Sequence, residues 1–211
     1  LEACQKIAEE IENTGGKATA IRCDLSKVED IRGLFQEIKE RFDRLDILVN
    51  NAGASITKPS MEVTVEDWDI MFDVNIKGLF FACQEAARLM IDQNNGKIIN
   101  ISSIGGIRTF KRIAPYSASK AAVIQLTRSL ASEWARYGIY VNGIAPGLIS
   151  TEMNTEQIQD ERLFNKMLKM IPLRRLGKPT DIAMLALYLS SDASNFMTGQ
   201  TISVDGGVTS E

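Results

Sequence analysis

Histidine is absent from this chain of 211 residues. Its absence excludes serine and cysteine hydrolases that depend on a histidine base, and it excludes most zinc enzymes, whose metal is commonly held by histidine. Any proton transfer must therefore use tyrosine, lysine, aspartate or glutamate.

Cysteine is also scarce. The chain has three, Cys4, Cys23 and Cys83, which are widely spaced and form no Cys-x-x-Cys pair. An odd number without a regular framework predicts reduced thiols in a cytoplasmic protein. We expect the three side chains to behave as small buried hydrophobic groups.

Long apolar runs and an excess of positive charge are missing as well. The apolar stretches all fall short of the roughly 18 residues that a membrane span needs, so no membrane partner is expected. The net charge of −3 gives no indication of a nucleic-acid-binding surface. With 45% hydrophobic and 24% charged residues and no repeat or linker, residues 1–211 are predicted to form a single globular domain.

What the sequence does contain is an alternation of helical and strand patterns. Helical spacing and helix-start signals predict helices near residues 1–13, 26–42, 64–92, 116–137, 155–170 and 179–190. Short apolar runs predict strands at residues 18–23, 46–50, 97–102, 139–145 and 201–204. The second helix is expected to start with a capping box formed by Ser26 and Glu29. This alternation predicts a doubly wound α/β domain with a parallel sheet.

Polar and turn-forming residues follow the predicted strands. They are Asp24, Asn50, Asn51, Gly53, Ser102, Ser103, Pro146 and Gly147. Ligands of such sheets bind beyond the carboxyl ends of the strands, so the pattern indicates a binding site there. The alternative is ordinary turn chemistry, because asparagine, glycine and proline are turn formers in any case.

Tyr116 and Lys120 are the strongest candidates for chemistry. They stand four residues apart on a predicted helix, so the phenol and the ammonium share one face. At roughly 5 Å and an effective dielectric constant of about 20, their attraction is about 3 kcal/mol, which would lower the tyrosine pKa by about two units. Chance alone predicts roughly 0.23 such pairs in a chain of this composition, so the pair needs support from other residues.

The motifs taken together resemble the short-chain dehydrogenase/reductase family. In chain order they are Asn50-Asn51-Ala52-Gly53, Asp73-Val74-Asn75, Ser103 thirteen residues before Tyr116, Tyr116-Ser117-Ala118-Ser119-Lys120, Val141-Asn142, Pro146-Gly147 and Gly199-Gln200 with Val204-Asp205-Gly206-Gly207. The resemblance covers essentially the whole chain and implies a Rossmann-like fold. Gluconate dehydrogenase-type and 3-oxoacyl-carrier-protein reductase-type members look most similar.

The resemblance implies a catalytic set of Asn75, Ser103, Tyr116 and Lys120. Tyr116 would exchange a proton with the substrate oxygen while a hydride moves to or from a nicotinamide, and Ser103 would hydrogen-bond that oxygen. Lys120 would lower the pKa of Tyr116 and hold the nicotinamide ribose, and Asn75 would anchor a water that links Lys120 to solvent. The competing interpretations are an N-cap or loop role for Ser103 and a mid-helix polar contact for Asn75.

The resemblance also implies NAD or NADP as the cofactor. Besides Tyr116 and Lys120, the implied contacts are Asp24 and Leu25 near the adenine, Asn51, Ala52 and Gly53 along the adenosine, and Pro146, Gly147, Ile149 and Thr151 around the nicotinamide. The residue that separates NAD from NADP usually follows a strand that this sequence does not show, so the choice between them stays open.

The chain departs from the family at its front. No strand, glycine-rich turn and helix precede Asn50, and Gly15-Gly16 follows a predicted helix instead of a strand. By the resemblance, about 45 residues are absent, and the domain is expected to be N-terminally incomplete. In the family strand order 3-2-1-4-5-6-7, the strands predicted at residues 18–23 and 46–50 could then not pair with each other.

The substrate is expected to be a small secondary alcohol or ketone. Arg108, Lys111 and Arg112 place three cations in five residues between Ser103 and Tyr116, which would suit a sugar acid or a carrier-bound 3-oxoacyl chain. A solvated loop is an equal alternative. The resemblance implies a homo-oligomer, usually a tetramer. A rival function is a non-catalytic fragment that keeps the oligomer surface and binds dinucleotide poorly.

Overall fold

The computed structural model of the protein describes residues 1–151 and 160–210. The helices of eight residues or more are α1 (Glu2–Asn13), α2 (Val28–Arg41), α3 (Val65–Phe72), α4 (Leu79–Gln93), α5 (Ala114–Trp134), α7 (Glu161–Lys169) and α8 (Pro179–Ser190). The strands are β1 (Ile47–Asn50), β2 (Gly96–Ile101), β3 (Ile139–Pro146) and β4 (Thr201–Val204). A π-helical segment, η2 (Asp73–Gly78), joins α3 to α4, and short 3-10 turns lie at Ser60–Glu62, Ile104–Gly106, Ala135–Tyr137 and Asp192–Ser194.

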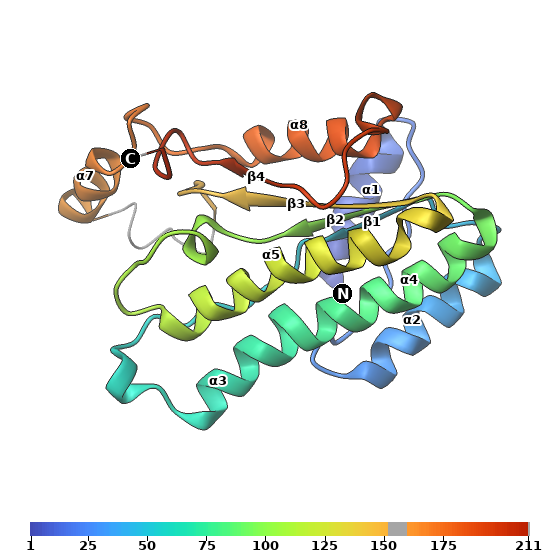
Figure 1. Ribbon diagram of the computed structural model, residues 1–211, viewed down its shortest axis with the longest axis horizontal. Coiled ribbons are helices and arrows are strands. Elements are labelled where there is room, and N and C mark those ends of the chain that lie inside the picture. Colours follow the sequence, from blue (N-terminus) through green and yellow to red (C-terminus); the bar gives the residue numbers. More distant parts are fainter. Residues whose placement is uncertain (152–159, 211) are drawn as a thin grey trace.

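The four strands form one parallel sheet in the order β1-β2-β3-β4. Helices α3, α4 and α5 lie on one face of this sheet, and α8 lies on the other (Figure 1). In parallel sheets the crossover helices pack on the faces, so both faces of the sheet are covered. The predicted α/β class with a doubly wound parallel sheet is therefore confirmed.

The core follows the alternation of side chains along the central strands. In β2, Ile98 packs with Val141 of β3 and with residues of α4 and α5, whereas Ile99 packs with Ile144 of β3 and Leu189 of α8. Successive strand residues point to opposite faces, so two neighbouring isoleucines enter two different apolar clusters. This packing holds α5 on one face of β3 and α8 on the other.

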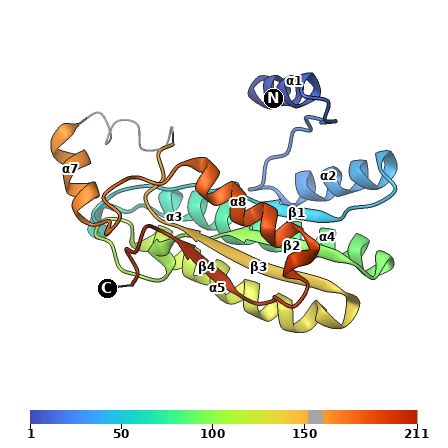
Figure 2. The ribbon, with the colours of Figure 1, turned by 90° about the horizontal axis from the view of Figure 1, so that it is seen from above.

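The predicted strand at residues 18–23 is wrong. This segment has no regular secondary structure and follows α1, which has no buried residue and stands apart from the other helices (Figure 2). A strand is stable only when its backbone groups pair with a neighbour, and the described residues place no strand beside this segment. An apolar pattern without a neighbouring strand is therefore insufficient to predict a strand.

Two predictions about helix starts had different outcomes. The capping box at Ser26 is wrong, because α2 begins at Val28 and the Ser26 hydroxyl donates instead to Asp24 Oδ1 at 2.7 Å. Serine after aspartate readily makes such a local turn, which competes with capping. The helix start at Thr64 is confirmed by a full capping box between Thr64 and Asp67.

The long helices are close to their predicted bounds. Residues 64–92 were expected as one helix and instead form α3 and α4 with η2 between them. Helix α5 starts two residues before Tyr116 and ends at Trp134, followed by a 3-10 turn. Of the helix expected at 155–170, residues 155–159 lie outside the described part, and α7 forms the remainder.

The cysteines do not share one environment. Cys83 is buried in the core, and this burial raises its thiol pKa to about 12. Cys23 is half-buried, and Cys4 is exposed on α1, so the prediction of a buried thiol is wrong for Cys4. Among the described helices, none combines the length and apolar character required to cross a membrane.

Candidate active site

Ser103 lies two residues beyond the carboxyl end of β2, where it caps a 3-10 turn. Its Oγ accepts a hydrogen bond from the Gly105 backbone N–H at 3.0 Å. The N-cap role considered for Ser103 is therefore real, yet it leaves the hydroxyl proton available to another acceptor. A Cβ on Gly105 would lie 3.3 Å from Ser103 Oγ and 3.5 Å from Tyr116 Cε1, so the serine and the tyrosine flank the same glycine.

Tyr116 lies in the first turn of α5 and is largely enclosed. Burial raises the pKa of its phenol, and a hydrogen bond with the Ser103 side chain opposes that rise. The net direction is opposite to the lowering estimated from the spacing of Tyr116 and Lys120. The reason is that enclosure removes water from the phenolate, which a simple charge–charge estimate ignores.

Lys120 lies one turn further along α5 and is only 4% exposed. Its Nζ donates to the Ile101 carbonyl oxygen at 3.0 Å and lies 5.9 Å from the centre of the Tyr116 ring. Burial lowers the pKa of Lys120 to about 8. The ammonium is thus fixed near the phenol, but it is itself destabilised by its surroundings.

Asn75 projects from the π-helical segment η2 and is 1% exposed. Its side chain accepts from Ala54 N–H at 2.8 Å and donates to Ala54 O at 2.9 Å. It also donates to Ser119 Oγ at 3.0 Å, and Ser119 Oγ donates to the Tyr116 carbonyl oxygen at 2.7 Å. Single-turn π segments often occur at functional sites, and this one connects the loop after β1 to the start of α5.

The loop after β1 carries the predicted residues Asn51, Ala52 and Gly53, all exposed. A Cβ on Gly53 would lie 3.2 Å from Lys120 Nζ and 3.2 Å from Asn75 Oδ1. The bare backbone at Gly53 therefore leaves the ammonium of Lys120 close to an open surface. This arrangement fits a group with hydroxyls, such as a ribose, that would approach Lys120 past Gly53.

Leu25 lies against the carboxyl end of η2. A side chain on Gly78 would overlap with the Leu25 carbonyl oxygen, so the glycine allows this segment to approach η2 closely. Asp24 Oδ1 accepts from the Ser26 hydroxyl and backbone, and these hydrogen bonds lower the pKa of the Asp24 carboxyl. Leu25 therefore lies beside the π segment that carries Asn75, and Asp24 directly precedes it in the chain.

Pro146 is the last residue of strand β3, and Gly147, Ile149 and Thr151 follow it. Gly147 N–H donates to the Val204 carbonyl oxygen of β4 at 3.0 Å, and a Cβ on Gly147 would lie 2.6 Å from Asp205 Cα. Ile149 forms an isolated parallel bridge with Gly177, and Thr151 is exposed. The strand bounds and the sheet order place this group at the same edge of the sheet as Ser103.

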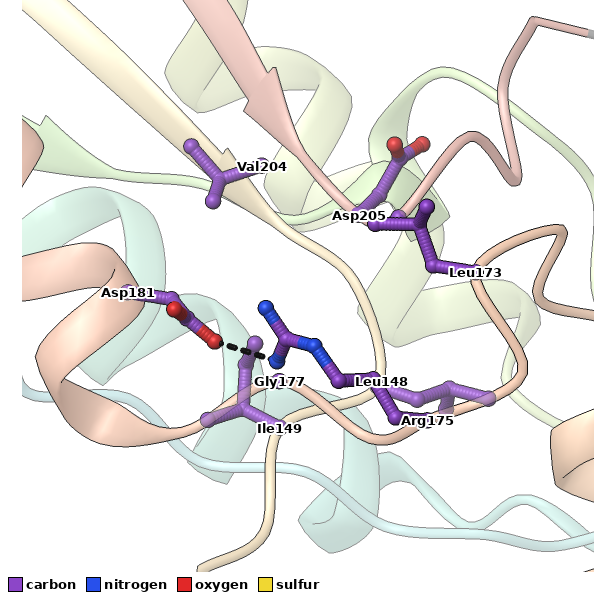
Figure 3. A pocket seen from close by; sticks show the side chains of 9 residues that line it. Leu148, Ile149, Leu173, Arg175, Gly177, Asp181, Val204 and Asp205 are labelled. Atoms are coloured by element: carbon purple, nitrogen blue, oxygen red, sulfur yellow. Dashed lines mark hydrogen bonds and ion pairs between the residues drawn. The ribbon is translucent and has the colours of Figure 1, made fainter.

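Two features were not singled out from the sequence. Ser119 links Asn75 to the tyrosine backbone, and its position three residues after Tyr116, on the same helical face, could have indicated this. A cavity of about 190 Å³ beside Ile149 is lined by Arg175 and Asp181, which form an ion pair (Figure 3). Nothing in the spacing of these two residues signals a cavity.

A serine, a tyrosine and a lysine thus lie together at the carboxyl edge of a parallel α/β sheet, where such sheets bind their ligands. The family model described as enoyl-(acyl carrier protein) reductase matches residues 1–209. The chain is 40% identical to 3beta-hydroxysteroid dehydrogenase 1 of Eggerthella lenta over 209 residues, which cover 99% of this chain and 80% of that protein. The chain belongs to the short-chain dehydrogenase/reductase family.

Two further comparisons agree with this assignment. The chain is 41% identical to the 3-oxoacyl-acyl-carrier-protein reductase FabG of Staphylococcus aureus, over 98% of this chain and 83% of that protein. A crystal structure of gluconate 5-dehydrogenase from Burkholderia cenocepacia, in complex with NADP and tartrate, superposes with a TM-score of 0.94. It is 38% identical and the match covers 98% of this chain and 81% of that chain.

Proposed function

We propose that this oxidoreductase transfers a hydride between a nicotinamide dinucleotide and a secondary alcohol or ketone, with Tyr116 handling the proton. The observation that supports this most is the shared environment of Tyr116, Ser103 and Lys120 at the carboxyl edge of β2. A nicotinamide would supply or accept the hydride when bound. The roles that follow concern the side chains of this chain.

Tyr116 would hold the proton at its Oη. Because burial raises the pKa of Tyr116, the phenol keeps its proton near neutrality and is suited to donate it to the oxygen of a ketone. Oxidation of an alcohol needs the phenolate instead, which is more populated at higher pH. Ser103 would donate its hydroxyl proton to the same substrate oxygen and stabilise the charge that develops there.

Lys120 would act in two ways. One N–H is used by the Ile101 carbonyl oxygen, which fixes the ammonium, and the others can reach a ribose hydroxyl above Gly53. The positive charge also favours the phenolate whenever Tyr116 gives up its proton. Asn75 would keep the Ala54 loop and Ser119 in register with Tyr116, so the cofactor-facing loop and the helix stay aligned.

The cofactor contacts would come from three loops. Asp24 and Leu25 would face the adenine, Asn51, Ala52 and Gly53 the adenosine, and Pro146, Gly147, Ile149 and Thr151 the nicotinamide. The NADP in the Burkholderia gluconate 5-dehydrogenase supports a nicotinamide cofactor for this chain. Either NAD or NADP fits the proposal.

An anionic substrate is the finer proposal, either a sugar acid or a 3-oxoacyl group on an acidic carrier. The loop before Tyr116 is tied down at both ends, since Arg108 donates to the Val208 carbonyl oxygen and Arg112 O accepts from Lys58 N–H. Lys111 and Arg112 are exposed on this fixed loop. Their charge would favour an anion near the mouth of the site. We propose that the enzyme works as a homotetramer, which gel filtration with light scattering would test.

Titration with NADH and NADPH, followed by their fluorescence, tests the function directly. We expect saturable binding of at least one of the two, followed by turnover with gluconate-type or 3-oxoacyl substrates. No binding of either at millimolar concentration would abandon the enzyme proposal for this chain. That outcome would favour the rival function of a non-catalytic member that keeps only the oligomer surface.

A further inference from the structure

Two short segments far apart in the sequence are hydrogen-bonded to each other next to Ile149 and Thr151, which are proposed to face the nicotinamide. Gly177 N–H donates to the Leu148 carbonyl oxygen at 2.9 Å, and Ser150 N–H donates to the Gly177 carbonyl oxygen at 2.9 Å. We call this junction, residues 148–150 with 176–178, the neck. It fixes the backbone on both sides of Ile149 and directly before Thr151.

The neck depends on a close backbone approach. A Cβ at Gly177 would overlap with Cδ1 of Ile149, so the Ile149 side chain packs directly over the Gly177 backbone. The pairing is nevertheless short, because it consists of one isolated bridge. An isolated bridge of two hydrogen bonds opens easily unless a further contact supports it.

Arg175 supplies such a contact. Its Nη1 donates to Asp181 Oδ2 at 2.8 Å and to the Leu176 carbonyl oxygen at 3.1 Å. The same carboxylate oxygen accepts from Lys178 N–H at 2.8 Å, where it caps the start of α8. Arg175 therefore connects one side of the neck to the amino end of a helix that is packed on the sheet.

Packing supports only part of the neck. Leu148 and Leu176 pack against a buried cluster of Ile104, Ile171 and Val208, whereas a cavity of about 190 Å³ lies beside Ile149 and Arg175. Leu148 and Ile149 line it together with Val204 and Asp205 at the end of β4 (Figure 3). Arg175 also lines the cavity, and its guanidinium points toward the Asp181 carboxylate. A side chain next to a cavity lacks dispersion contacts on that side, so directional bonds contribute more to holding it there.

We propose that Arg175 is a positioning residue of the enzyme, which acts through the neck on Ile149 and Thr151. This inference rests on the proposed function, because those two residues are the ones expected to face the nicotinamide. The Arg175–Asp181 ion pair holds residues 176–178 against residues 148–150. Its loss would loosen the cofactor-facing backbone without touching Tyr116, Ser103 or Lys120.

Amide hydrogen exchange tests the neck without any cofactor. In Arg175→Ala, we expect the Ser150 and Gly177 amides to exchange about fivefold faster than in the wild type, while amides of β2 keep their rates. The matched control is Arg44→Ala, which removes another exposed ion pair, to Asp46 just before β1. Wild-type exchange at Ser150 and Gly177 in Arg175→Ala would overturn the proposal.

Steady-state kinetics then test the effect on the reaction. We expect Arg175→Ala to raise the KM for the nicotinamide dinucleotide about tenfold, below the roughly hundredfold loss that a 1 Å displacement can cause. Arg175→Lys should recover part of this loss, because it keeps one charged donor to Asp181, and Arg44→Ala should leave KM unchanged. A purely structural role would instead lower the active fraction and leave KM as it was.

The outcomes separate the two proposals. If the wild type binds no dinucleotide, the proposed function fails and the role of Arg175 in positioning the cofactor fails with it, although faster exchange would still establish the neck contact. If the wild type turns over and Arg175→Ala keeps a normal KM, only the inference about Arg175 is overturned.

Discussion

Strands β1 and β2 lie side by side in one sheet, yet their surroundings differ. In β2, Ile98 is fully buried and Ile99 is 1% exposed, whereas in β1 Ile47 is 39% and Val49 is 45% exposed. Strand β2 pairs on both sides, while β1 pairs only with β2 in the part of the chain that the structure describes. The same kind of apolar run thus gives a core strand in one place and an exposed edge in the other.

Three of the four catalytic candidates lie on the β2 side of this comparison, whereas Asn75 is hydrogen-bonded to Ala54 in the loop after β1. Ser103 follows β2, and Lys120 on α5 is bonded to the last residue of β2. The segment before α2, in contrast, carries Asp24 and Leu25 on irregular backbone. Side chains are therefore most fully enclosed where strands and helices pack on each other, and the proposed proton chemistry would occur there.

The largest expected effect concerns Tyr116. Replacing Tyr116 with Phe removes the proposed proton donor, and we expect kcat to fall about 10³-fold. The melting temperature should hardly change, because the ring stays in place. The measurement is steady-state turnover alongside thermal unfolding, with Tyr137→Phe in the 3-10 turn after α5 as the control. Turnover retained in Tyr116→Phe would refute the role given to this residue.

The sequence predicted the sheet and its packed helices better than it predicted the segment before α2. The strands at β1 to β4 and helices α4, α5 and α8 follow from runs and spacings that agree with their final neighbours. Residues 18–23 carry a similar apolar pattern but form no strand, because pairing depends on a partner elsewhere in the chain. Local pattern predicts an element, whereas burial is decided by what lies next to it.

The same distinction applies to the site. The spacing of Tyr116 and Lys120 predicted that they share a helical face, and the structure places the ammonium 5.9 Å from the ring centre. The direction of the tyrosine pKa could not be predicted, because the enclosure of Tyr116 depends on the loop at Ser103 and Gly105. The link from Asn75 to Ser119 joins residues 44 positions apart and was equally hidden.

The second prediction concerns the buried charge of Lys120. The folded-state pKa of about 8 lies below the usual 10.5, so between these pH values the unfolded chain binds more protons than the folded one. The free energy of unfolding should therefore rise with pH across this window, by about 3 kcal/mol in total from this group. Lys120→Met should be free of this rise.

Urea denaturation of wild type and Lys120→Met at pH 7, 8, 9 and 10 measures the difference. We expect Lys120→Met to gain relative stability below about pH 8, and its advantage to shrink toward pH 10. Parallel curves for the two proteins across this range would show that Lys120 is not destabilised by burial.

The third prediction contrasts two glycines, one packed against α5 and one on the open side of α2. A Cβ on Gly106 would lie 2.7 Å from the Ala121 backbone nitrogen, so Gly106→Ala should destabilise the protein by about 2 kcal/mol. Gly33 in α2 has nothing within 4 Å of its Cβ position, and Gly33→Ala should stabilise the protein by about 0.5–1 kcal/mol. Chemical denaturation of both variants checks the opposite signs, and equal shifts would contradict the packing difference.

The smallest expected effect lies on α1. Ile7 is 54% exposed and no residue of α1 is buried, so Ile7→Ser should change the free energy of unfolding by less than about 0.5 kcal/mol. The matched comparison is Ile31→Ser in α2, where the side chain is fully buried and its loss should cost several kcal/mol. Denaturation midpoints of the two variants compare the contributions of α1 and α2 to the free energy of unfolding. A large loss of stability in Ile7→Ser would mean that the Ile7 side chain is buried against a partner in solution. The exposure of α1 would then reflect contacts that the described structure lacks, and its apolar pattern would be a true signal of burial.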